Sequence, residues 1–91
     1  MNKWVYTITN GKALHEAIDD GDVKATIEAL KLCNQELLDK LTDEDREWKG
    51  DDIEYAINFL DYTVTEDKEE VDSYLDDFYG LCDDLRAWIT L

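Results

Sequence analysis

Residues 68–91 read KEEVDSYLDDFYGLCDDLRAWITL, and the spacing of the apolar residues in this stretch decides the fold class. Since an α-helix completes a turn in about 3.6 residues, apolar residues at alternating steps of four and three form one stripe along it. The stretch therefore predicts a helix over residues 66–89, capped by Thr65 and packed against a core by one face. Its stripe consists of Val71, Leu75, Phe78, Cys82, Leu85 and Ile89.

Acidic residues fall on the opposite face of this predicted helix. From the first acid to the last the helix rises about 22 Å, so a carboxylate occurs about every 3 Å. Charges along one DNA strand have a similar axial spacing of ~3.4 Å. The acids form pairs at seven-residue intervals with one additional residue, and they are Glu69, Glu70, Asp72, Asp76, Asp77, Asp83 and Asp84.

This ladder of acids weakens the helix that carries it. Like charges three and four residues apart destabilise a helix, and the only bases in the segment are Lys68 and Arg86, one near each end. Asp83 and Asp84 lie near the C-terminus, where the helix dipole disfavours negative charge. A binding role for the acidic face would account for the tolerance of this penalty.

The charge of the whole chain is strongly polarised. Residues 43–91 hold seventeen acidic and four basic residues, a net charge of −13, whereas residues 1–42 carry a net charge of −2. Such a field repels nucleic acid and anionic membranes and attracts basic protein surfaces. We therefore expect no direct nucleic-acid binding and no membrane binding. With 91 residues, of which 44% are hydrophobic, the chain is expected to form a single folded domain over residues 1–91.

The rest of the chain predicts a mainly α fold, a compact bundle of about four helices with a short N-terminal strand. Residues 3–9 alternate in the manner of a strand, and residues 62–65 are the other β-like run, so pairing between them would give a small α+β variant. A free edge on the N-terminal strand also leaves a homodimer open.

Turn and capping residues predict the remaining helix boundaries. One helix is expected over residues 12–20, with Gly21 as its C-cap, and Asp22 caps a second helix that runs to Leu41 and bends or breaks at Asn34-Gln35. A capping box over residues 42–45 opens a short turn that Gly50 closes. The next helix is then expected over residues 52–61, capped by the residue after Gly50.

The sequence offers no assembly of catalytic groups. His15 is the only histidine, and the chain has no glycine-rich loop and no nucleophile motif, so we expect no enzyme, no catalytic residue and no cofactor. Cys33 and Cys82 lie in apolar surroundings, which is typical of buried free thiols in a reducing cytoplasm. The N-terminus lacks the apolar run of a signal peptide, and cytoplasmic localisation follows as an expectation.

The start of the acidic half has some of the spacing of a metal-binding loop. Asp43, Asp45, Glu47, Asp51 and Glu54 match five ligand positions of an EF-hand loop, but Trp48 stands where that loop needs glycine for its sharp turn. We therefore predict no specific metal site.

In size, charge and patterned acids, residues 43–91 resemble the small acidic proteins of phages that mimic DNA, such as anti-restriction proteins, uracil-glycosylase inhibitors and anti-CRISPR proteins. The resemblance implies an inhibitor that occupies the nucleic-acid groove of a CRISPR effector nuclease first, and of a restriction or repair enzyme next. An acidic protein–protein adaptor or assembly factor unrelated to DNA is the alternative. Tyr55, Tyr62, Tyr74 and Tyr79 would serve as an aromatic rim or pack at the edge of the core. The partner-binding residues are expected to be the seven acids of the ladder together with Asp43, Glu44, Asp45, Asp51 and Asp52.

Overall fold

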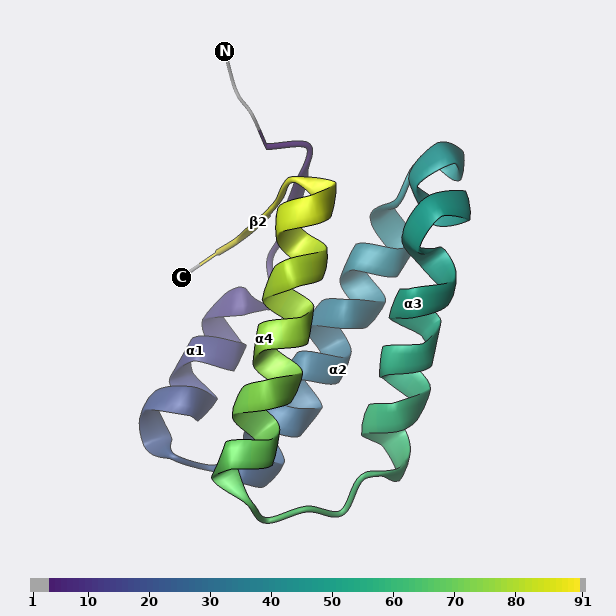
Figure 1. The fold of residues 1–91 in the computed structure, drawn as a ribbon. Helices are drawn as coiled ribbons and strands as arrows, with labels where there is room; N and C mark the ends of the chain where they lie inside the picture. The colour runs from purple at the N-terminus through teal and green to yellow at the C-terminus, as the bar shows by residue number, and fades with distance from the viewer. Residues whose placement is uncertain (1–3, 91) are drawn as a thin grey trace.

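Helices dominate the computed structural model, which describes residues 4–90 (Figure 1). The mainly α bundle with a short N-terminal strand is confirmed. Lys3, where the N-terminal strand was expected to begin, lies outside the described residues. In chain order the elements are β1 (Tyr6–Ile8), α1 (Gly11–Asp20), α2 (Val23–Lys40), α3 (Asp43–Tyr62), α4 (Lys68–Leu85) and β2 (Ala87–Ile89).

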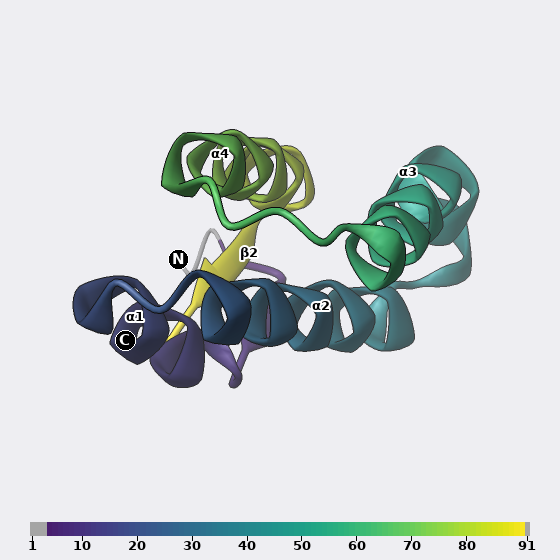
Figure 2. The same cartoon turned by 90° about the horizontal axis from the view of Figure 1, so that it is seen from below.

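Helix α2 lies at the centre of the arrangement. It packs against α1, α3, α4 and β1, whereas α3 and α4 touch each other little and lie apart on the same side of α2 (Figures 1 and 2). The core fills the space between these elements, because each helix turns its apolar stripe inward. Its most deeply buried side chains include Ile8, Leu14, Leu30, Leu37, Ile53 and Phe78.

The connection from α1 to α2 follows the predicted capping. Gly21 adopts a left-handed conformation with a φ of 68°, which glycine reaches without a steric penalty, and its N–H donates to the carbonyl of Ile18. The Asp22 carboxylate accepts a hydrogen bond of 3.0 Å from the N–H of Ala25. Helix α2 then runs without a break through Asn34, so the predicted interruption there is wrong.

One continuous helix replaces the two short helical segments expected over residues 43–61. Thr42 caps α3 as predicted, since its hydroxyl accepts from the N–H of Asp45 at 3.2 Å. Gly50, however, does not end the helix; it is buried in it, and a Cβ there would lie 3.9 Å from Leu38 Cδ1 of α2. A glycine inside a helix costs only about 1 kcal/mol, which the burial of Ile53 and Leu60 against the core outweighs.

Both ends of α4 differ from the sequence prediction. The helix begins at Lys68 with Asp67 as its N-cap, two residues after Thr65, and it ends at Leu85 rather than at residue 89. Arg86 then takes a left-handed conformation with a φ of 56°. Because the chain reverses there, Ile89 lies in a strand and not on the apolar stripe of α4.

The two strands at opposite ends of the chain pair in parallel. Tyr6, Thr7 and Ile8 face residues 87, 88 and 89 respectively, and the N–H of Thr90 donates to the carbonyl of Ile8 at 3.0 Å. The predicted pairing with residues 62–65 is wrong: this run is the last residue of α3 and part of the connection to α4. Gly11 leaves room for the pair, since a Cβ there would lie 2.3 Å from the backbone oxygen of Thr90.

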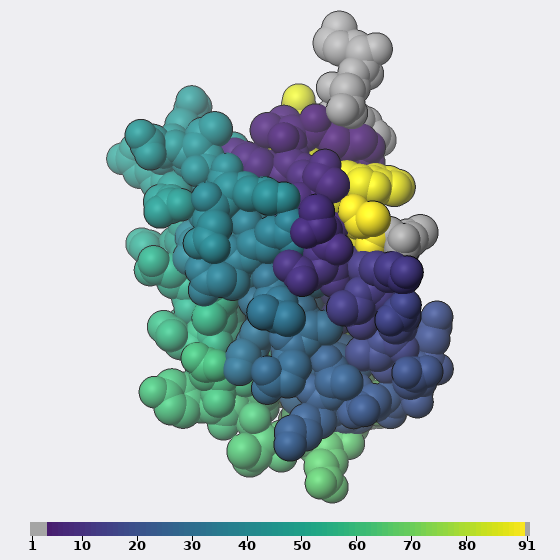
Figure 3. Space-filling view, turned by 180° about the vertical axis from the view of Figure 1, so that it is seen from behind, coloured from purple at the N-terminus to yellow at the C-terminus, as the bar shows by residue number. Residues whose placement is uncertain are grey.

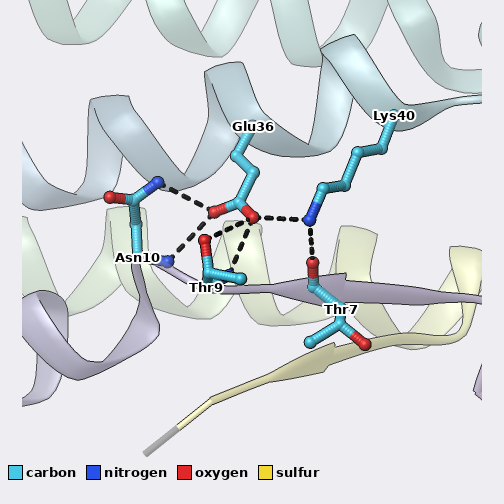
Figure 4. A network of polar contacts seen from close by, with 5 residues as sticks. All are labelled: Thr7, Thr9, Asn10, Glu36 and Lys40. Carbon is cyan, nitrogen blue, oxygen red and sulfur yellow. Dashed lines mark hydrogen bonds and ion pairs between the residues drawn. The ribbon is translucent and has the colours of Figure 1, made fainter.

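The Glu36 carboxylate fixes the turn between β1 and α1 to the side of α2 (Figure 4). It accepts hydrogen bonds from the backbone and side chain of Thr9, from the backbone and side chain of Asn10, and from Lys40. Burial raises the pKa of this carboxyl group, but the bonds from Lys40, Thr9 and Asn10 outweigh burial and lower the pKa from 4.5 to about 2. The group is therefore held as a carboxylate at neutral pH.

Candidate functional site

All seven acids of the predicted ladder are exposed along α4. The helix buries Val71, Leu75, Phe78, Cys82 and Leu85 against the core, so the stripe positions on it are confirmed as far as Leu85. The carboxylates therefore project from a helix of 18 residues, about 27 Å long, whose opposite face is anchored. They are Glu69, Glu70, Asp72, Asp76, Asp77, Asp83 and Asp84.

Four of the five acids predicted on α3 are exposed in the same way, namely Asp43, Glu44, Asp51 and Asp52. Asp45 differs, because it is half-buried and accepts a short hydrogen bond from the hydroxyl of Tyr6. The same hydroxyl accepts from the N–H of Thr42 at 3.1 Å. Asp45 thus joins α3 to the N-terminal strand and is less available to a partner than its neighbours.

Helices α3 and α4 run in opposite directions, so the acidic start of α3 lies near the acidic end of α4 (Figure 1). Lys49 of α3 pairs there with Asp84 of α4 at 3.3 Å and lies 4.9 Å from the ring centre of Trp48. Lys49 therefore compensates part of the negative charge at the C-terminal end of the ladder, where the helix dipole disfavours acids.

The face opposite α4 is formed by residues 4–10, α1 and α2, with α3 along one side of it (Figure 3). The first three of these belong to the part of the sequence with a net charge of only −2. The polarity of the sequence thus becomes a polarity of the folded molecule, with α4 and most of α3 carrying the negative charge.

A groove of about 420 Å³ separates α3 from α4. Aromatic rings form its walls: Phe59 of α3 meets Tyr74 of α4 edge to face with ring centres 5.1 Å apart, and Tyr55 stacks beside Phe59 at 6.5 Å. Asp52 and Asp77, one from each helix, also line it and are exposed. The groove therefore combines an apolar interior with negative charge from both helices.

Asn34 of α2 lines the same groove and is only 1% exposed. Its Nδ2 donates to the carbonyl of Leu30 at 2.9 Å, which fixes the orientation of the amide. Its Oδ1 is buried and has no hydrogen-bond partner within residues 4–90. Buried polar atoms are nearly always paired, so this acceptor is an exception that calls for an explanation.

The tyrosines expected at the rim divide into two groups. Tyr55 and Tyr62 on α3 are 72% and 85% exposed, in keeping with a rim role. Tyr74 and Tyr79 on α4 are half-buried against the core, where burial raises the pKa of Tyr79.

Sequence reasoning missed Asn34, Phe59 and Leu81 as groove residues. One signal was present, since Asn34 lies four residues from both Leu30 and Leu38 and is a polar residue at a core position of α2. No pattern in the sequence indicated that α3 and α4 lie apart and leave a groove between them.

The residues with EF-hand-like spacing are not gathered into a site. Their stretch is helical, and helical geometry spreads Asp43, Glu47 and Asp51 along the axis instead of folding them around an ion. Across the part of the chain that the structure describes, no group of three histidine, cysteine or acidic side chains is placed to hold a metal.

Comparison with models of known protein families, with curated proteins and with solved structures finds no match to this chain. Within residues 4–90, no helix combines the length and apolar composition needed to cross a bilayer.

Proposed function

We propose that this protein binds a basic nucleic-acid-binding protein and excludes nucleic acid from its binding groove. The observation that supports this most directly is the row of seven exposed carboxylates along α4. At about one charge per 3 Å, this row approximates the axial charge density of a single DNA strand. The anchored apolar face of the helix holds it in place, and fixed charge avoids part of the ordering cost of binding.

The placement of α3 adds a second support. The helix lies on the same side of α2 as α4 (Figure 2), and Asp52 and Asp77 line the groove from opposite sides. A nucleic-acid duplex likewise presents two charged strands on either side of a groove. A basic cleft that contacts both strands of a duplex would meet a related distribution of charge here.

The first target class to test is a CRISPR effector nuclease, acting in the cytoplasm of a phage-infected bacterium. Such a nuclease reads a short duplex motif with arginine side chains and holds nucleic acid in a positively charged channel, and both would attract a row of carboxylates. A restriction enzyme and a uracil-DNA glycosylase are the next classes.

The test is inhibition of these three enzymes on a duplex substrate at two duplex concentrations and two salt concentrations. The ladder variant carries Asp76→Lys, Asp77→Lys and Asp83→Lys, and it leaves Asp84 paired with Lys49. The matched control reverses three exposed acids of α1, with the changes Glu16→Lys, Asp19→Lys and Asp20→Lys. Both variants change the net charge equally.

We expect inhibition of at least one enzyme that weakens as duplex or salt is added, because charge neutralisation by a phosphate-like surface is salt-dependent. The ladder variant should lose at least about tenfold in potency, the equivalent of ~1.4 kcal/mol, while the α1 control keeps it. Circular dichroism checks that both remain helical. Equal losses in both variants, or inhibition that added duplex does not relieve, would contradict the proposal.

The adaptor alternative has one observation in its favour, the exposed apolar residues at the end of α3 and just after it. Tyr62 is 85% exposed and Val64 93% exposed, and exposed apolar side chains mark protein contacts where they form a contiguous patch. If the protein is an adaptor, Tyr62→Ser and Val64→Ser should abolish partner binding, and that binding should depend little on salt. The ladder variant should then bind the partner as well as the wild type does.

A further inference from the structure

We propose that the groove between α3 and α4 receives an arginine side chain of the partner protein. The inference rests on the proposed function, since it names the group by which a basic partner is held. It also adds a second kind of contact, in which a cation enters the molecule instead of pairing with carboxylates on its surface.

The first argument is the unpaired acceptor beneath the groove. Asn34 Oδ1 is buried without a hydrogen-bond partner within the described residues, and its orientation is fixed because Nδ2 is committed to the carbonyl of Leu30. The group that would satisfy this oxygen is a hydrogen-bond donor, either an N–H or an O–H group. Guanidinium carries five such donors, and one can reach inward while the others remain near the rim.

The second argument is the chemistry of the walls. Tyr55, Phe59 and Tyr74 present aromatic rings to the groove. A planar guanidinium stacks on aromatic faces and is more weakly hydrated than an ammonium, so its transfer into such a groove costs less. Lysine lacks the planar face, and an apolar side chain would leave the Asn34 oxygen unpaired.

The third argument is the charge at the groove. Asp52 and Asp77 are exposed carboxylates that line it from both helices, and neither forms an ion pair with a described residue. Guanidinium and carboxylate form charge-assisted hydrogen bonds with matched geometry. A neutral donor such as an amide would gain less from these two acids.

The binding requires a small movement of the wall. Asn34 Oδ1 has almost no accessible surface in the free protein, so a donor reaches it only when a side chain that lines the groove shifts. Rotamer changes of this size are common when interfaces form. The shift is itself measurable, because it changes the magnetic environment of the groove residues.

The test is a nuclear magnetic resonance titration of the isolated protein with N-acetyl-arginine methylamide. The same blocked derivatives of citrulline, which is neutral and of nearly the same shape, and of lysine serve as controls. We expect the arginine probe to shift the side-chain amide signals of Asn34 and the backbone signals around Phe59 and Tyr74. Both control probes should bind at least about tenfold more weakly, since they lack either the charge or the planar fork.

Three variants make the test specific. Asn34→Leu removes the acceptor with little change of shape, and Asp77→Asn removes one groove carboxylate. Asp76→Asn is the matched control, since it makes the same change on the next residue of α4 but outside the groove. The first two should weaken arginine binding several-fold and the third should not. If Asn34→Leu does not fold, the difference in arginine binding between Asp76→Asn and Asp77→Asn tests the proposal by itself.

The inference is overturned if the Asn34 amide signals do not move, if citrulline binds as well as arginine, or if Asp76→Asn weakens binding as much as Asp77→Asn. The first and third outcomes would leave only diffuse attraction of cations to α4, and the second would show that the positive charge of arginine plays no part in binding. Because this titration uses neither nucleic acid nor the partner, its failure leaves the duplex-competition result standing. Failure of that competition would in turn leave the arginine site in place for a basic partner of another class.

Discussion

The carboxylate of Glu36 accepts two hydrogen bonds from Asn10, of 3.0 Å from the backbone nitrogen and 2.8 Å from Nδ2 (Figure 4). Its second oxygen accepts from Thr9 and from Lys40, and Lys40 also donates to the carbonyl of Thr7 at 2.6 Å. Strand β1 has only three residues and, within residues 4–90, a single partner strand. Side chains of α2 therefore supply much of what holds it in place.

The first prediction concerns Glu36→Gln. This change keeps the shape of the side chain but removes its charge and one acceptor, so unfolding should become easier by about 2 kcal/mol, as for other hydrogen bonds to charged groups. Urea unfolding at neutral pH measures the difference. Asp39→Asn, an exposed acid on the same helix, is the control and should change stability by less than about 0.5 kcal/mol.

The advantage of the wild type over Glu36→Gln should depend on pH. Because the folded state lowers the pKa of Glu36 from 4.5 to about 2, the advantage is complete above pH 4.5 and is lost as the pH falls toward 2. Unfolding curves of both proteins over this range report the loss. A difference that stays constant from neutral pH to pH 2 would show that the charge of Glu36 is not what stabilises the turn.

The second prediction compares Gly11→Ala with Gly80→Ala. A Cβ at Gly11 would lie 2.3 Å from the backbone oxygen of Thr90, which cannot move without disturbing β2, so we expect a loss of about 2 kcal/mol or more. Gly80 is exposed in the middle of α4, and a Cβ there would meet no other part of the molecule within 4 Å, so alanine should stabilise the protein by about 1 kcal/mol. The melting temperature should fall for Gly11→Ala and rise for Gly80→Ala, and a Gly11→Ala variant as stable as the wild type would refute the packing of Gly11 against the C-terminal strand.

The third prediction concerns Arg86, which has a left-handed backbone with a φ of 56°. Glycine adopts this conformation without the Cβ clash that alanine suffers, so Arg86→Gly should be more stable than Arg86→Ala by about 1 kcal/mol. The two variants have the same charge, so their difference isolates the backbone effect. Equal stabilities would indicate that α4 continues past Leu85.

The fourth prediction concerns the cysteines, which are free and buried, as the sequence predicted. Burial raises the pKa of both the Cys33 and the Cys82 thiol to about 12, so almost no thiolate exists at pH 8. Ellman's reagent should therefore react with the native protein no faster than the fold opens and exposes the thiols. In concentrated guanidinium it should react with both thiols at once. Immediate reaction of either thiol in the native protein would contradict this.

The fifth prediction follows from the net charge of −15. Repulsion among the carboxylates opposes folding, and salt screens it, so the melting temperature should rise between ~0.01 M and ~0.5 M sodium chloride. The ladder variant should show a smaller rise. A melting temperature that falls with added salt would mean that ion pairs such as Lys49–Asp84 outweigh the repulsion.

The sequence by itself determined the features that depend on residues a few positions apart. The caps at Gly21, Asp22 and Thr42, the buried stripe of α4 and the exposure of its acids all follow from contacts within one or two helical turns. The uneven distribution of charge along the chain also follows directly from the sequence.

Only the tertiary structure decided the features that join distant parts of the chain. Packing against α2 carries α3 through Gly50, and pairing with β1 takes residues 87–89 out of the helix that their spacing predicted. The Glu36 network and the groove over Asn34 likewise depend on how separate elements meet. The free energy of these contacts comes from burial and hydrogen bonding between segments far apart in the chain, and no local periodicity records which segments those are.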